Sequence, residues 1–171
     1  MKRTLLLFFT LVVAVSTMNV PVQMVRNIAY GTNMTTEEVQ ACINNAGLMF
    51  ENLQFYEQLE DSDDLQSLDI DGNGEKIGCF VNCLLRKKEM VTGTQIDVEK
   101  VKKMVHSPLI DDSVIHIAHP SMDTCADHLK SHNECEATIK FLVCFMDEMR
   151  RRRTQETNTE SCVPNDIDIV D

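Results

Sequence analysis

The spacing of the cysteines is the feature that most restricts how this chain can fold. There are seven, and the gaps between the first six are 36, 3, 41, 9 and 8 residues: Cys42, Cys79, Cys83, Cys125, Cys135 and Cys144, with Cys162 following. Cys79 and Cys83 stand one helical turn apart, so a helix would place both sulfurs on one face. Cys135 and Cys144 are two and a half turns apart, so their sulfurs point to opposite sides and bond to different partners.

The N-terminal residues indicate that these cysteines meet an oxidising compartment. Lys2 and Arg3 precede an apolar run from Leu5 to Val15, and Ala14-Val15-Ser16 has the small residues of a cleavage site. This pattern predicts a signal peptide over residues 1–16, and the run is too short to favour the alternative of a membrane anchor. We therefore expect a secreted, extracellular protein without membrane insertion. Closely spaced cysteines in such a protein are normally disulfides rather than metal ligands.

Composition indicates an all-α domain that does not bind nucleic acid. The net charge of −11 argues against a nucleic-acid partner, and only 4 Pro and 6 Gly interrupt the chain. Apolar periodicity and caps predict helices over residues 35–45, 48–59, 75–90, 96–106, 113–130 and 134–152. Thr35 and Glu38 form a capping box, Gly47 ends the first helix, and Asn133 caps the last. Residues 17–33 carry no strong period. We expect the helical domain to span residues 17–153, with an acidic tail over residues 154–171.

Two motifs that suggest metal binding are incomplete. Asp69-Ile70-Asp71-Gly72-Asn73-Gly74 matches the first half of a calcium-binding loop, but Phe80 occupies the position of the closing Glu. His128 and His132 have helical spacing, but Leu129 replaces the Glu of the zinc-protease motif. No nucleophile elbow or phosphate loop is present. We expect neither a metal or other cofactor nor an enzyme activity.

The complete cysteine pattern resembles that of the six-cysteine insect odorant-binding proteins, over about residues 35–145. The three-residue and final eight-residue gaps are the most diagnostic features. From the residues alone, the only restriction on the disulfide pairing is that Cys135 and Cys144 have different partners. The resemblance implies the pairs Cys42–Cys83, Cys79–Cys135 and Cys125–Cys144. It also implies about six helices around an apolar cavity, tied by three interlocked disulfides.

The resemblance further implies a carrier that takes small hydrophobic ligands, such as odorants or pheromones, through aqueous fluid to receptors. Positions relative to the cysteines suggest a set of ligand-contacting side chains, whose simpler interpretation is ordinary core packing: Val81, Leu85, Met90, Val91, Met122, Leu142 and Phe145. We expect Met90 and Val91 to close the helix that carries Cys79 and Cys83. His119 is the candidate polar anchor. The alternative function is that of a secreted helical protein-interaction factor without a small-molecule ligand.

The C-terminal region departs from the family pattern. Cys162 is an odd cysteine, so we expect either a free thiol or a homodimer through an intermolecular bridge. The run Arg150–Arg153 is either a basic helix end or a processing site that would remove Cys162. In some members of the family that the sequence resembles, the C-terminal segment enters the cavity at low pH. Val163, Ile167 and Val170 could form the apolar stripe for such a movement, and the alternative is a disordered tail. Asn33 begins a sequon and is a candidate glycosylation site.

Overall fold

The computed structural model describes residues 20–52, 72–105, 111–126 and 131–160. Its helices are α2 (Val22–Thr32), α3 (Thr36–Ala46), α5 (Gly72–Lys87), α6 (Val98–Val105), α7 (Asp112–Ala126) and α8 (Glu134–Glu160). A two-residue hairpin, β1 (Val91–Thr92) and β2 (Gln95–Ile96), lies between α5 and α6. Residues 50–52 are also helical, and the remainder of the helix expected over residues 48–59 lies outside the described ranges. The predicted all-α fold class is confirmed.

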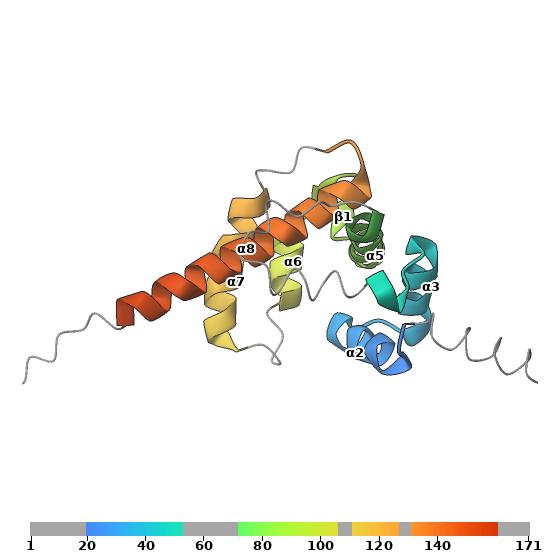
Figure 1. Ribbon diagram of the computed structural model, residues 1–171, viewed down its shortest axis with the longest axis horizontal. Helices are drawn as coiled ribbons and strands as arrows, with labels where there is room; N and C mark the ends of the chain where they lie inside the picture. The colour runs from blue at the N-terminus through green and yellow to red at the C-terminus, as the bar shows by residue number, and fades with distance from the viewer. Residues whose placement is uncertain (1–19, 53–71, 106–110, 127–130, 161–171) are drawn as a thin grey trace, which may run out of the picture.

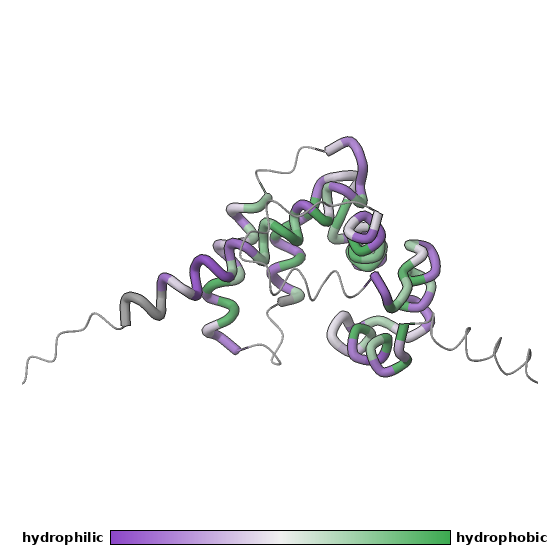
Figure 2. The backbone as a smooth tube through the Cα atoms, viewed as in Figure 1, coloured by the Kyte–Doolittle hydropathy of each residue, from purple (hydrophilic) through white to green (hydrophobic). Residues whose placement is uncertain are grey.

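The long helix α8 is the axis on which the other elements assemble (Figure 1). Helix α5 packs along it near its N-terminal end, and α7 packs against it further along. On the far side of α5 lies α3, which in turn carries α2, while α6 contacts α7. Hydrophilic residues dominate the C-terminal part of α8, which extends beyond the other helices (Figure 2). The N-terminal part of this helix therefore contributes to the core, whereas Arg153, Thr154 and Gln155 near its other end are exposed.

The buried apolar side chains form two clusters. The first joins α2, α3, α5 and α8, with Val39, Cys42 and Ile139 completely buried. The second joins α5, β1, α6, α7 and α8, and it includes Leu85, Met122 and Phe141. Val81 on α5 packs against both clusters. Helices α5 and α8 are thus shared walls between the two halves of the core.

Three helices end in the same hydrogen-bonded motif. After α2, α3 and α5 the chain turns through a left-handed residue, Asn33, Gly47 and Glu89, with φ of 50°, 60° and 56°. In each case two backbone N–H groups return to carbonyls of the last helical turn, which satisfies acceptors that the helix leaves open. An apolar residue follows each turn and packs back on the helix: Met34, Leu48 and Met90. Gly47 was predicted to end α3, and this is confirmed.

The predicted N-terminal caps are also confirmed. Thr35 and Glu38 form both hydrogen bonds of the capping box at α3. At α8 the side-chain oxygen of Asn133 accepts from the backbone N–H of Cys135 at 2.9 Å. These caps replace hydrogen bonds that the first turn of a helix cannot make internally.

Four local expectations were wrong. Residues 17–33 were expected to lack a period, yet α2 buries Val25 and Ala29 on one face. Met90 and Val91 do not close α5, because Glu89 leaves the helix and Val91 pairs with Ile96 across the hairpin. The predicted helix over residues 96–106 therefore begins only at Val98, where Asp97 caps it through the N–H of Lys100.

The fourth incorrect expectation was the end of the last helix. Helix α8 continues to Glu160 instead of ending near Arg152. The first residues of the expected tail are therefore helical. The chain beyond Glu160 lies outside the described residues, including Cys162 and the apolar stripe expected in the tail.

Candidate functional site

Three disulfides fix the helices around the core. They join Cys42 to Cys83, Cys79 to Cys135, and Cys125 to Cys144, the same pairs that the family resemblance implies. Through them α5 is bonded to α3 on one side and to α8 on the other, and α8 is bonded to α7 as well. Cys42 and Cys125 are completely buried. The bridges therefore connect α3, α5, α8 and α7 in series, whereas α2, α6 and the hairpin carry none of them.

The α5–α8 contact is close because a glycine lies in it. A Cβ at Gly78 would be only 2.2 Å from the carbonyl oxygen of Cys135 and 3.0 Å from Cβ of Ile139. With hydrogen in that place, the helices approach until the Cα atoms of Cys79 and Cys135 are 4.3 Å apart. Gly78 thus allows the disulfide beside it to form.

A buried polar pair sets the register of the same two helices. Nδ2 of Asn82 donates to Oγ1 of Thr138 at 3.0 Å, and that hydroxyl donates to the carbonyl of Glu134 at 2.9 Å. Asn82 and Thr138 are 5% and 1% exposed, and these hydrogen bonds satisfy polar groups that are buried away from water. Outside the core, Arg86 and Glu134 form an ion pair across the same helices.

Most of the side chains suggested as ligand contacts meet in one place. The second cluster contains Leu85, Val91 and Met122 among its buried members and Val81, Met90 and Phe145 among its partly buried ones. The aromatic ring of Phe145 is stacked on that of Phe141, with centroids 6.3 Å apart. Leu142 instead packs against the first cluster. We name the second cluster and its partly buried neighbours the α5–α8 chamber.

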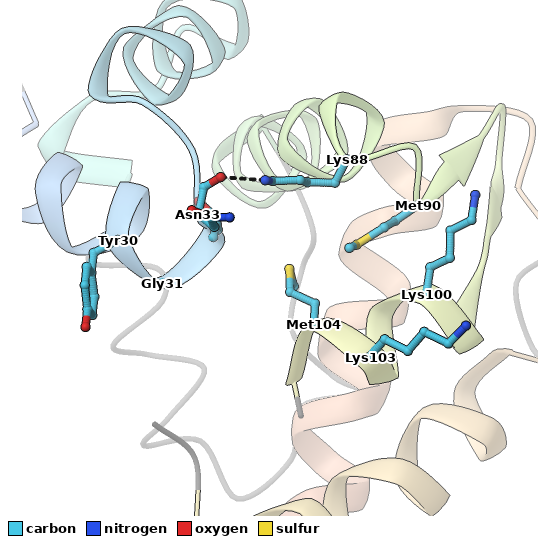
Figure 3. A pocket seen from close by; sticks show the side chains of 9 residues that line it. Tyr30, Gly31, Asn33, Lys88, Met90, Lys100, Lys103 and Met104 are labelled. Atoms are coloured by element: carbon cyan, nitrogen blue, oxygen red, sulfur yellow. Dashed lines mark hydrogen bonds between the residues drawn. The ribbon is translucent and has the colours of Figure 1, made fainter. Parts of the chain in front are cut away.

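A groove opens at the surface beside this chamber (Figure 3). It has a volume of about 480 Å³, and nine residues line it: Tyr30, Gly31, Thr32, Asn33, Lys88, Met90, Lys100, Lys103 and Met104. Met90 belongs to both the groove and the chamber. Sequence reasoning named only Met90 and Asn33 among these residues. The spacing of Lys100, Lys103 and Met104, which places them on one helical face, was the available signal.

The other candidate residues occupy separate places. Asn33 is exposed at the end of α2, where its carbonyl accepts from Nζ of Lys88. His119 is half-buried on α7. Asn73, which would belong to the incomplete calcium loop, accepts through its side-chain oxygen from Asn52 at 2.8 Å, and Phe80 is buried in the first cluster. Within the described ranges, no three His, Cys, Asp or Glu residues gather where they could hold a metal ion.

The arginine run is helical and partly engaged in ion pairs. Arg151 and Arg152 both contact the carboxylate of Glu148, and Arg152 also donates to Oγ1 of Thr124 on α7 at 3.3 Å. Hydrogen bonding from Arg151 is the main cause that holds the pKa of Glu148 below its ordinary value. The run lies inside α8 and not at its end, because the helix continues to Glu160, so the expected basic helix end is wrong. Processing at the run stays a prediction.

None of the described helices is long and apolar enough to cross a membrane. Comparisons with curated proteins and with solved structures found no match. The sequence model of the PBP/GOBP family, the insect odorant- and pheromone-binding proteins, matches residues 31–148. This range contains α3, α5, α6, α7, the three disulfides and the first half of α8. The chain therefore belongs to the PBP/GOBP family.

Proposed function

We propose that this protein is a secreted carrier that holds a small apolar ligand in the α5–α8 chamber and delivers it through aqueous fluid to a receptor. Members of the family are secreted and bind small odorant- or pheromone-like molecules. The observation that carries the assignment to this chamber is the meeting of Val81, Leu85, Met90, Val91, Met122 and Phe145 in one cluster. Their positions relative to the cysteines in the sequence predict the same set of ligand contacts.

The physical basis is apolar burial by side chains that can adapt. A hydrophobic ligand gains free energy in proportion to the area that it removes from water. Met90, Phe145 and Met149 are partly buried members of the chamber, so part of their apolar surface is free to contact a ligand. Methionine is flexible and polarisable, which favours ligands of varied shape. The disulfides keep the surrounding helices in place while these side chains move.

Displacement of a fluorescent apolar probe tests the proposal. N-phenyl-1-naphthylamine should bind the purified protein with enhanced emission, and small apolar volatiles should displace it. Phe145→Ala should weaken probe binding by about tenfold, because a large part of the apolar contact is removed. Met146→Ala is the matched control, since Met146 is the next residue on α8 but packs against the first cluster.

Two outcomes would contradict the proposal. Equal weakening by the Phe145 and Met146 variants would place the ligand outside the chamber. Failure of the probe and of every candidate volatile to bind would favour the alternative, a secreted helical factor that acts by binding another protein.

The remaining expectations about partners and processing stay proposals of the same kind. They are cleavage of a signal peptide at residue 16, a homodimer through Cys162 and a glycan on Asn33. Intact-mass measurement of the secreted protein, with and without reduction, tests all of them at once.

A further inference from the structure

The groove beside the chamber has an unusual charge for this protein. The chain carries 27 acidic and 16 basic residues, yet the nine residues that line the groove include three lysines and no Asp or Glu. Lys88 follows the end of α5, and Lys100 and Lys103 lie one turn apart on α6. The ammonium of Lys88 points toward Asn33, and those of Lys100 and Lys103 point the other way (Figure 3). Three positive charges along the border of one groove still make a local positive field in an acidic protein, which favours an anion.

Few carboxylates lie near the ammonium groups of these lysines. The charge of Lys88 acts on Glu38, and Lys100 has Asp97 as an acidic partner. Nζ of Lys88 donates to the carbonyl of Asn33 at 2.6 Å. This hydrogen bond uses one hydrogen atom of the ammonium group but does not neutralise its positive charge. Lys100 donates to the carbonyl of Glu89 at 2.8 Å and stands 3.5 Å from the carboxylate of Asp97. Lys103 is exposed, and its ammonium group forms no hydrogen bond or ion pair within the described part of the chain.

Lys102, which is also on α6, differs from these lysines because two carboxylates contact its ammonium group. The ammonium of Lys102 contacts Asp123 on α7 at 2.5 Å and Glu99 on its own helix at 2.9 Å. Hydrogen bonding to Asp123 is the main cause that raises its pKa. The lysines on the groove side of α6 have no such pair of acidic partners.

The floor of the groove is apolar and leads toward the chamber. Met90 and Met104 both point into the space between Lys88 and α6 (Figure 3). Met90 also packs against the buried members of the chamber. A volume of about 480 Å³ lies within the range of small-molecule sites. Positive groups at the rim and thioethers at the floor match a molecule with an anionic head and an apolar tail.

We propose that the groove binds the carboxylate of an amphipathic acid whose hydrocarbon tail lies along Met104 and Met90 toward the chamber. The head group accepts hydrogen bonds from the ammonium of Lys103, with Lys88 and Lys100 adding positive charge at the rim. This inference rests on the proposed function, because Met90 is common to the groove and the chamber. It adds a preference among ligands: an acid binds more tightly than the alcohol of the same chain length.

The experiment compares two ligands that differ only at the head. Dodecanoate and dodecanol compete with N-phenyl-1-naphthylamine at pH 7, below their micelle-forming concentrations, on the wild-type protein and on Lys103→Met. Methionine keeps the length of the stem and removes the charge. Lys103→Met should weaken dodecanoate by about threefold to fivefold, the effect typical of an exposed charge pair, and should leave dodecanol unchanged. Raising the salt concentration should shrink the preference for the acid.

Lys87→Met is the matched control, because Lys87 is exposed, lies next to Lys88 and does not line the groove. It should leave both affinities unchanged, although it alters the net charge by the same amount. Met104→Gln should weaken the acid and the alcohol equally, because both tails pass it. Thermal unfolding of each variant confirms that the fold is retained.

The outcomes separate this inference from the function on which it rests. Equal affinity of the wild-type protein for dodecanoate and dodecanol, or equal losses in the Lys103 and Lys87 variants, would overturn the anion site while leaving the carrier intact. Absence of binding by both ligands and the probe would overturn both proposals.

Discussion

At the scale of single residues, the close contact between α5 and α8 depends on Gly78, because glycine has no side chain. Its hydrogen faces the backbone of α8, where a methyl group would lie 2.2 Å from a carbonyl oxygen. The obstructing atom belongs to backbone, and that backbone is held by the adjacent Cys79–Cys135 disulfide. The helices would have to separate to admit a larger residue.

We therefore expect Gly78→Ala to lower the free energy of unfolding by about 1–3 kcal/mol, the usual cost of overpacking. Chemical denaturation of the oxidised protein measures it. Gly31→Ala is the matched control, because Gly31 lies in α2 with nothing within 4 Å of the added methyl group. That change should raise stability by about 0.5–1 kcal/mol through helix propensity. Equal effects of the two substitutions would contradict the close approach.

At the scale of elements, the residues at the helix ends are the ones whose type most clearly indicates the local structure. Glu38 is an example, because its carboxylate accepts from the backbone N–H of Thr35 at 2.9 Å. This hydrogen bond is the main cause that holds the pKa of Glu38 below its ordinary value of 4.5. A group with a lowered folded-state pKa stabilises the fold above its unfolded-state pKa, and this contribution is lost as the pH falls through the folded-state value.

Glu38→Gln should therefore reduce thermal stability at pH 7, and its difference from the parent protein should shrink between pH 7 and pH 3 as the pH falls through the lowered folded-state pKa of Glu38. Glutamine retains the capping hydrogen bonds, so the difference isolates the charge. Melting curves of both proteins over this pH range measure it. Glu37→Gln, in the same turn, is the control for loss of a negative charge near the helix N-terminus. A difference that persists undiminished at pH 3 would contradict the assignment.

The same helix ends show what sequence could and could not predict. Thr35, Gly47 and Asn133 were recognised because each is a residue type that its cap strongly prefers. Glu89 adopts the same left-handed turn as Gly47, but glutamate gives no signal for it, so α5 was extended through Met90. The hairpin has two residues in each strand, too few for an alternating pattern. The stripe in α2 could have been predicted, because Val25, Ile28 and Ala29 stand at helical spacing in the sequence.

Other features depend on tertiary structure, so no local pattern could reveal them. The groove combines Lys88 with Lys103, and only the packing of α6 near the end of α5 brings them together. Asn82 looks polar in the sequence and is buried because Thr138 satisfies it. The six chamber residues that did meet were placed by the family resemblance, because the cysteine positions fix the register of α5, α7 and α8.

At the scale of the whole molecule, the disulfides should contribute unequally to stability. Cys79–Cys135 joins residues 56 apart, whereas Cys125–Cys144 joins residues 19 apart. By the chain-entropy model, replacing both cysteines of the longer pair with Ala should cost about 1 kcal/mol more than replacing those of the shorter pair. Denaturation of the two double variants measures the difference. A larger loss from the shorter pair would mean that packing around buried Cys125 outweighs the entropy of the unfolded chain.

The pairing of the cysteines also has a consequence for the order of events during biosynthesis. On the proposed secretory route, residues enter the oxidising compartment in sequence, so Cys42, Cys79 and Cys83 would enter it well before α8. Among these three only one native bridge exists, Cys42–Cys83, and Cys79 must wait for Cys135. During this interval the thiol of Cys79 can attack the completed bridge or capture Cys42 first. The nascent chain therefore depends on disulfide exchange until its last helix arrives.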